Sequence, residues 1–162
     1  MKTLKGSCHC GAVSFQVQSH TPQPYMRCYC SICRKTAGGG GYAIYIMGEA
    51  RTLRVQGRKH LSYYRAKLEE GGKQVHSPAR RYFCKRCGSA LFIADPRWKK
   101  WVYPHASAID TPLPGPVEVA QIMLDSKCNW AEVQGGKRHR KFPEFPDQSI
   151  EDWHKSRRVY LK

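Results

Sequence analysis

The stretch MRCYCSICRK, residues 26–35, decides how this chain is organised. It places Cys28, Cys30 and Cys33 within six residues. Tetrahedral zinc takes four ligands, and these three thiols supply all but one of them. The fourth position is therefore either filled by another part of the chain or left open for water or a substrate.

Four of the remaining cysteines fall into two separated pairs, CHC and CKRC, formed by Cys8 with Cys10 and by Cys84 with Cys87. Two such pairs provide four thiolates, which complete a tetrahedral zinc shell. Each pair is followed by a glycine, as tight metal-binding turns often require. A closed four-thiolate site has no room for a substrate, so we expect a structural zinc that contributes about 10–16 kcal/mol of binding energy.

Metal ligation explains these thiols better than disulfides do. The N-terminal sequence MKTLKGSCHCG has no apolar run of signal-peptide length, and no stretch approaches a membrane span. A cytoplasmic location without membrane attachment is therefore expected. Cysteines are kept reduced there, and closely spaced ones are typical of metal sites.

The three-cysteine group has a different predicted role. Catalytic zinc keeps three protein ligands and leaves one position open. With three thiolates the site would carry a formal charge of −1, which suits it to holding an incoming thiol as a thiolate. The alternative is a closed shell, completed by Cys128 or by one of three histidines: His9, His76 or His105.

The chain is strongly basic, with 28 Lys and Arg against 12 Asp and Glu, a net charge of +16. The excess is uneven: residues 51–100 carry 14 cations and three acids, whereas residues 101–162 carry nine and eight. A positive field attracts nucleic acid, acidic membranes or small carboxylate substrates. It also occurs on an ordinary solvated surface.

Short alternating segments predict an all-β fold. In residues 11–18, Val13, Phe15 and Val17 fall on one face, which is the period of a half-buried strand. Two short helices are expected, at 31–36 and at 149–158, and the glycine run between the first helix and the next strand is read as a turn. The further predicted strands are 42–47, 52–56, 61–65, 80–84, 90–94 and 117–124.

The length of 162 residues suits one domain or one domain with a tail. We assign residues 1–134 to a zinc-binding domain. The basic segment GGKRHRK introduces a C-terminal extension, residues 135–162, that packs on the domain or trails from it. Ser149 and Asp152 have the spacing of a capping box at the start of the helix in this extension.

Three motifs, in order, resemble the glutathione-dependent formaldehyde-activating enzyme family, which also includes centromere protein V. They are GSCHCGAVSFQV at 6–17, CYCSICRKTAG at 28–38 and RYFCKRCGSALF at 81–92, and LDSKCNWAEV at 124–133 is a looser match. The resemblance implies a β-tent fold of short antiparallel sheets.

The same resemblance assigns roles to the cysteines. It implies a structural zinc on Cys8, Cys10, Cys84 and Cys87 and a catalytic zinc on Cys28, Cys30 and Cys33, hence two zinc ions. The named enzyme joins glutathione and formaldehyde into S-(hydroxymethyl)glutathione. The resemblance therefore implies that this chain is a carbon–sulfur lyase that acts on a small thiol and an aldehyde.

Two function hypotheses follow. In the first, the chain is this enzyme, and Arg34, Lys35 and Lys127, which adjoin the motifs, bind the substrate carboxylates. In the second, both zinc ions are structural and the basic face binds nucleic acid or another polyanion. Aromatic residues interleaved with the cations of residues 51–100 favour the second hypothesis: Tyr63, Tyr64, Tyr82 and Trp98.

Overall fold

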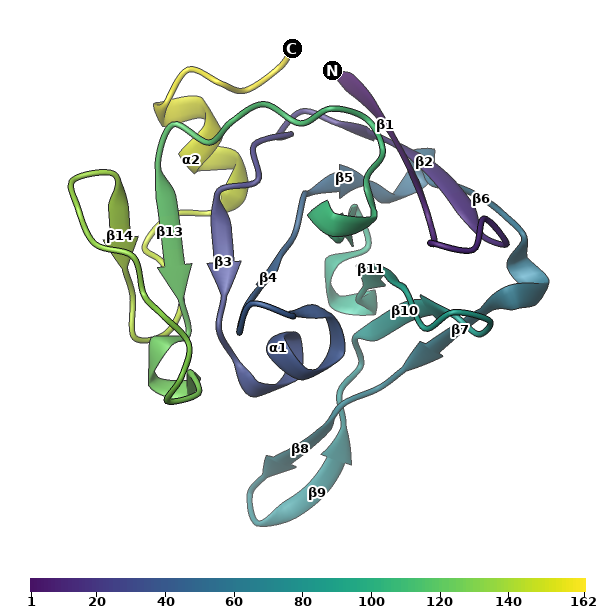
Figure 1. Cartoon of the computed structure of the whole chain (residues 1–162), viewed down its shortest axis with the longest axis horizontal. Helices are drawn as coiled ribbons and strands as arrows, with labels where there is room; N and C mark the ends of the chain where they lie inside the picture. The colour runs from purple at the N-terminus through teal and green to yellow at the C-terminus, as the bar shows by residue number, and fades with distance from the viewer.

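The computed structural model describes residues 1–162 and confirms the strand-dominated architecture. Fourteen short strands are joined by two α-helices and five single turns of 3₁₀-helix. The chain ends meet, since the N-terminal amine donates a hydrogen bond to the carbonyl of Lys162 (Figure 1). Neither helix has the length and apolar character that crossing a bilayer would require.

Two antiparallel sheets form one half of the molecule. The first has the order β1 (Lys2–Ser7), β2 (Ser14–Ser19) and β6 (Arg54–Gln56). The second has the order β5 (Gly48–Glu49), β12 (Trp101–Pro104), β11 (Ala90–Ala94), β10 (Arg80–Cys84) and β7 (Leu61–Tyr64). The predicted alternation at 11–18 is confirmed, because Val13, Phe15 and Val17 are all buried.

The third sheet adds parallel pairing to a fold whose other sheets are antiparallel, as expected. Its order is β14 (His139–Lys141), β13 (Val119–Ile122), β3 (Met26–Cys28) and β4 (Ala43–Ile44). Strand β13 runs parallel to both β3 and β14. Parallel neighbours need a long connection, and the chain between β3 and β13 supplies one. An alternation pattern carries no information about strand direction.

The two remaining strands, β8 (Lys67–Glu70) and β9 (Lys73–His76), form a hairpin that projects from the body of the molecule (Figure 1). Both predicted helices are present, as α1 (Ser31–Ala37) and α2 (Ile150–Ser156). Ser149 caps α2, since its Oγ accepts a hydrogen bond from the backbone N–H of Asp152 at 3.1 Å. This is the capping arrangement expected from the sequence.

Each half of the molecule has its own apolar core. The larger core lies between the first two sheets, where the rings of Phe15 and Phe92 meet edge to face at 5.7 Å. It includes Cys8 and Cys84. The smaller core lies behind the third sheet and includes Cys28 and Cys33, together with Tyr25, Ala43, Ala120, Ile122 and Trp153.

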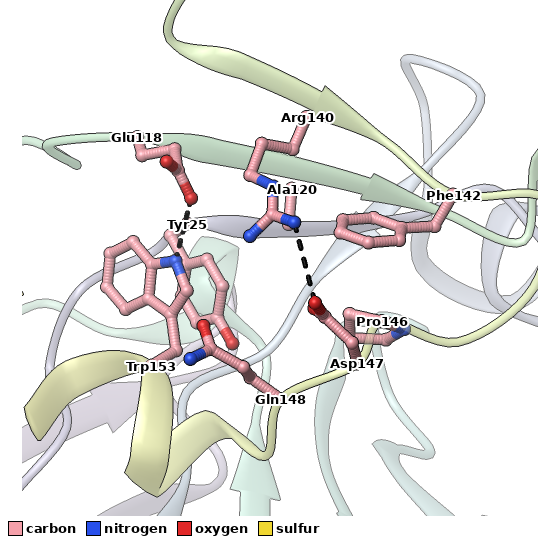
Figure 2. Close-up of a pocket in the computed structure, with 9 residues that line it drawn as sticks. All are labelled: Tyr25, Glu118, Ala120, Arg140, Phe142, Pro146, Asp147, Gln148 and Trp153. Atoms are coloured by element: carbon pink, nitrogen blue, oxygen red, sulfur yellow. Dashed lines mark hydrogen bonds and ion pairs between the residues drawn. The ribbon is translucent and has the colours of Figure 1, made fainter. Parts of the chain in front are cut away.

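Residues 135–162 supply the edge strand β14 of the third sheet and pack α2 against that sheet. Figure 2 shows the indole of Trp153, from α2, stacked on Tyr25 from the domain, with ring centroids 3.7 Å apart. The indole N–H donates to Glu118 at 3.0 Å, and Arg157 binds the same carboxylate. Tyr25, Glu118 and Trp153 also line a cavity of about 10 Å³, which holds about one water molecule. The extension therefore completes the smaller core.

Candidate metal centres

The two cysteine pairs converge on one point. The Sγ atoms of Cys8, Cys10, Cys84 and Cys87 all lie within 4.8 Å of one another. Both pairs sit on similar turns, each closed by a glycine in the left-handed region. Gly11 has φ +71° and donates its N–H to the carbonyl of Cys8 at 3.0 Å. Gly88 has φ +74° and donates to the carbonyl of Cys84 at 2.9 Å.

The spacing of these sulfur atoms fits zinc. Zinc–sulfur bonds of 2.3 Å in a tetrahedron put the sulfurs about 3.8 Å apart. The Sγ atoms of Cys8 and Cys10 are 3.6 Å apart, and those of Cys10 and Cys84 are 3.8 Å apart. Cys8 and Cys84 are buried, whereas Cys10 and Cys87 are exposed at the surface. The group thus fits a metal ion held between the core and the surface.

The second group consists of Cys28, Cys30 and Cys33, whose Sγ atoms also lie within 4.8 Å of one another. Cys28 ends β3, and Cys30 is the N-cap of α1, where its sulfur accepts the N–H of Cys33 at 3.4 Å. The short turn between strand and helix therefore brings all three thiols to the helix start. We call these residues the triplet.

Hydrogen bonds within the triplet divide the charge unequally. They lower the pKa of Cys30, with the bond from Cys28 contributing most, and they raise the pKa of Cys28. A single thiolate is thus stabilised at the expense of a second one. A divalent cation would remove this competition, so the donor set fits zinc.

No other Cys, His, Asp or Glu joins the triplet. None of the four residues predicted as possible closing ligands has a donor atom in this group. Cys128 is in the loop after the 3₁₀ turn Leu124–Ser126, and His9 lies in the turn of the four-cysteine group. His76 ends β9 in the projecting hairpin, and His105 is buried beyond β12.

Two further residues lie next to the triplet: Tyr45, which the sequence did not mark, and His105, which was predicted only as a possible closing ligand. The hydroxyl of Tyr45 donates to Sγ of Cys33 at 3.2 Å, and its ring packs on His105 with centroids 4.6 Å apart. Burial, and secondarily the charge of Arg81, lower the pKa of His105 to about 4, so its imidazole is neutral at pH 7. No local motif marks Tyr45 or His105, because only pairing between distant segments brings them here.

Tyr29, between the first two cysteines of the triplet, is fully buried. Its single hydroxyl proton is shared between Gln121 Oε1 and the carbonyl oxygen of Glu132, both 3.1 Å from the hydroxyl oxygen. Tyr29 therefore connects the segment that carries the triplet to β13 and to the loop around residue 132.

The three predicted substrate-binding cations differ in their surroundings. Arg34 is half-buried on α1, and its Nε has no hydrogen-bond partner. Lys35 is exposed on the same helix. Lys127 donates to the carbonyl of Cys128 at 3.1 Å. Two of these cations thus lie on α1, directly after Cys33, and the third lies in the loop that contains Cys128.

A separate basic cluster lies beside the CKRC turn of the four-cysteine group. The backbone N–H of Lys85 donates to the carbonyl of His60 at 2.8 Å, which brings the CKRC turn against residues 58–60. Desolvation, and then the charges of Lys59, Arg86 and Lys85, lower the pKa of His60. Of the four aromatic residues predicted to support polyanion binding, Tyr63, Tyr64 and Trp98 are about half exposed. The fourth, Tyr82, stacks on Phe92.

Comparison with known proteins adds three findings. The family model described as glutathione-dependent formaldehyde-activating enzyme matches residues 3–123. A Halomonas elongata protein with the provisional name glutathione-dependent formaldehyde-activating enzyme is 53% identical over 151 residues, covering 93% of this chain and 94% of its own. A crystal structure of a Rhodobacter sphaeroides protein superposes with a TM-score of 0.51 at 28% identity, over 68% of this chain and 91% of the other.

Proposed function

This chain belongs to the glutathione-dependent formaldehyde-activating enzyme family, and on that premise we propose that it joins a small thiol, glutathione or a close analogue, to an aldehyde such as formaldehyde. The reverse reaction cleaves the same carbon–sulfur bond, so the proposed class is a carbon–sulfur lyase. The proposal places the protein in the cytoplasm, where glutathione is abundant.

The observation that carries the proposal is the triplet without a fourth protein ligand. A catalytic zinc site has three protein ligands and an open position, and a structural site has four. We assign the triplet to the first kind and the group of Cys8, Cys10, Cys84 and Cys87 to the second. The two groups would then hold two zinc ions with different roles.

Cys28, Cys30 and Cys33 would hold a zinc ion whose chemistry is to keep a bound thiol as a nucleophilic thiolate. In the overall addition the thiol sulfur bonds to the carbonyl carbon, the C=O π bond breaks, and the proton that the thiol gives up ends on the carbonyl oxygen, which gives a hemithioacetal. Arg34, Lys35 and Lys127 would attract the carboxylates of glutathione. Tyr45 donates its hydroxyl proton to Cys33 Sγ and so moderates the negative charge of the triplet.

The direct test is formaldehyde–glutathione exchange, followed with ¹³C-labelled formaldehyde by exchange spectroscopy, on protein with measured zinc content. We expect faster formation of S-(hydroxymethyl)glutathione than in buffer with free zinc. The Cys28→Ser variant should lose this acceleration. Wild-type protein with two zinc ions and no acceleration would contradict the proposal.

A second candidate function rests on the basic cluster at the four-cysteine group. Arg58, Lys59, Lys85 and Arg86 are exposed, and none forms an ion pair with an acidic residue. Such a cluster would suit a phosphate backbone. Binding to duplex DNA or single-stranded RNA that weakens steeply with salt, and is lost when Lys85 and Arg86 become Gln, would support this function.

A further inference from the structure

Arg81 in β10 has a charged side chain with no partner. Its Nε and Nη1 atoms are buried and form no hydrogen bond, while its backbone pairs with Tyr64 and Ile93. Guanidinium remains charged at any physiological pH. A buried charged donor left unpaired is costly, and such groups in native proteins usually have a ligand or partner.

No acidic residue of the chain fills this role. Asp95 is the acidic residue whose pKa the charge of Arg81 affects. That pKa is lowered mainly by Arg97 and to a smaller extent by Arg81. Both oxygens of Asp95 are already bound by Arg97. Oδ1 accepts from the Arg97 backbone N–H at 2.9 Å and from Nε at 3.0 Å, and Oδ2 accepts from Nη2 at 2.7 Å. Arg81 therefore remains free for an anion from outside.

Strand register puts Arg81 on the side of the sheet that faces the triplet. Arg81 is in register, through one residue of β11, with Tyr103 of β12, so the two side chains share a face. His105 follows two residues later and continues that face. Tyr45 pairs with His105 and reaches Cys33, so this face of the sheet leads to the triplet.

The charges on this face support the same placement. The positive charge of Arg81 adds to burial in lowering the pKa of His105, and it opposes the rise that burial causes in the pKa of Tyr45. On α1, directly after Cys33, Nε of Arg34 is a second buried guanidinium nitrogen without a partner. Unpaired cationic groups thus come from both β10 and α1.

We propose that Arg81 binds a carboxylate of the thiol substrate whose sulfur the triplet receives. This inference rests on the proposed function and names a specificity-determining residue for it. Glutathione has two carboxylates and a net charge of −1, and a guanidinium fork can bind a carboxylate with two parallel hydrogen bonds. The substrate then supplies the partner that Arg81 lacks within the chain.

The test measures thiol binding without aldehyde, by calorimetry on the zinc-loaded full chain. Two probes are compared: glutathione, and cysteamine, which has a thiol and no carboxylate. The variants are R81Q, R81K and the matched control R80Q. Arg80 is exposed on the opposite face, with its guanidinium 5.0 Å from the ring centroid of Tyr63.

We expect R81Q to weaken glutathione binding by roughly tenfold or more, as loss of a charge-assisted bidentate contact implies. Cysteamine binding and zinc content should stay at wild-type values, and R80Q should change neither probe. R81K keeps the charge without the fork, so its glutathione affinity should fall between those of wild type and R81Q. It also provides the comparison if R81Q does not fold.

Glutathione binding to R81Q or R81K at wild-type strength would overturn the inference. An equal loss for both thiols, or loss of a zinc ion, would overturn it as well, because Arg81 would then balance the charge of the triplet. Failure of the proposed function gives a different result. A chain that binds glutathione through Arg81 but does not accelerate its reaction with formaldehyde would refute the proposed function alone.

Discussion

Replacing Cys84 or Cys28 by Ser should separate the two metal groups. Both side chains are buried, at 0% and 9% exposure, so the local cost of a buried hydroxyl is similar, about 1–3 kcal/mol. Cys84→Ser should abolish the native fold and release one zinc ion. Cys28→Ser should also release one zinc ion but leave the chain folded. The two variants should differ in folding because the two metal ions would connect chain segments of very different separation.

The four-cysteine group links segments far apart in the chain, since Cys10 and Cys84 are separated by 74 positions. The triplet spans only five positions, from Cys28 to Cys33. Closing the longer loop costs about 2.4 kcal/mol more, from (3/2)RT times the logarithm of the length ratio. A structural zinc contributes about 10–16 kcal/mol, as much as the whole stability of about 5–15 kcal/mol of a typical domain. Loss of this metal should therefore unfold the chain.

The measurements are metal content by plasma mass spectrometry and urea unfolding followed by near-ultraviolet circular dichroism. The reasoning would be refuted by a Cys84→Ser protein with a wild-type urea midpoint. A Cys28→Ser protein that loses both zinc ions and its near-ultraviolet signal would refute it equally.

Three further predictions concern other parts of the molecule. Cys128→Ser should keep both zinc ions and thiol–aldehyde activity, because Cys128 lies outside both metal groups; a lost zinc ion would make Cys128 a ligand. Trp153→Ala should destabilise the chain by about 3–5 kcal/mol, because it removes the stack on Tyr25 and the bond to Glu118. Calorimetry should then show Tm lowered by roughly 6–20 °C, and a shift under about 3 °C would mean that the extension does not stabilise the domain. Burial lowers the folded-state pKa of His154 from 6.5 to about 4, so the unfolded chain takes up the proton first. Stability should thus fall between pH 6.5 and pH 4 by up to about 3 kcal/mol, and His154→Gln should reduce the difference in urea midpoint between pH 7 and pH 5; an unchanged difference would contradict the assignment.

Short-range features of the sequence were sufficient for the cysteine groups and several elements. The strand at 80–84 and the strand at 90–94 have the predicted bounds, and the cap at Ser149 is confirmed. These features depend on neighbouring residues: alternation sets which side chains share a face, and a side-chain oxygen caps the next turn. The strands at 2–7 and 101–104 were missed, because their patterns are weak and pairing with distant strands stabilises them.

The sequence by itself determined which thiols share a turn, because CHC, CKRC and CYCSIC each place their sulfurs within reach through local geometry. The meeting of the CHC and CKRC pairs, expected from their four thiols, was brought about by the tertiary structure. The direction of the strands was decided only by the tertiary structure, as the parallel pairing of β13 with β3 shows. The surroundings of the triplet were also decided there. Tyr45, His105 and Arg81 come from three separate strand regions, and Cys128, so close to a matched motif, lies outside both groups. Contacts between distant segments depend on register and packing over the whole chain, and no short motif encodes them.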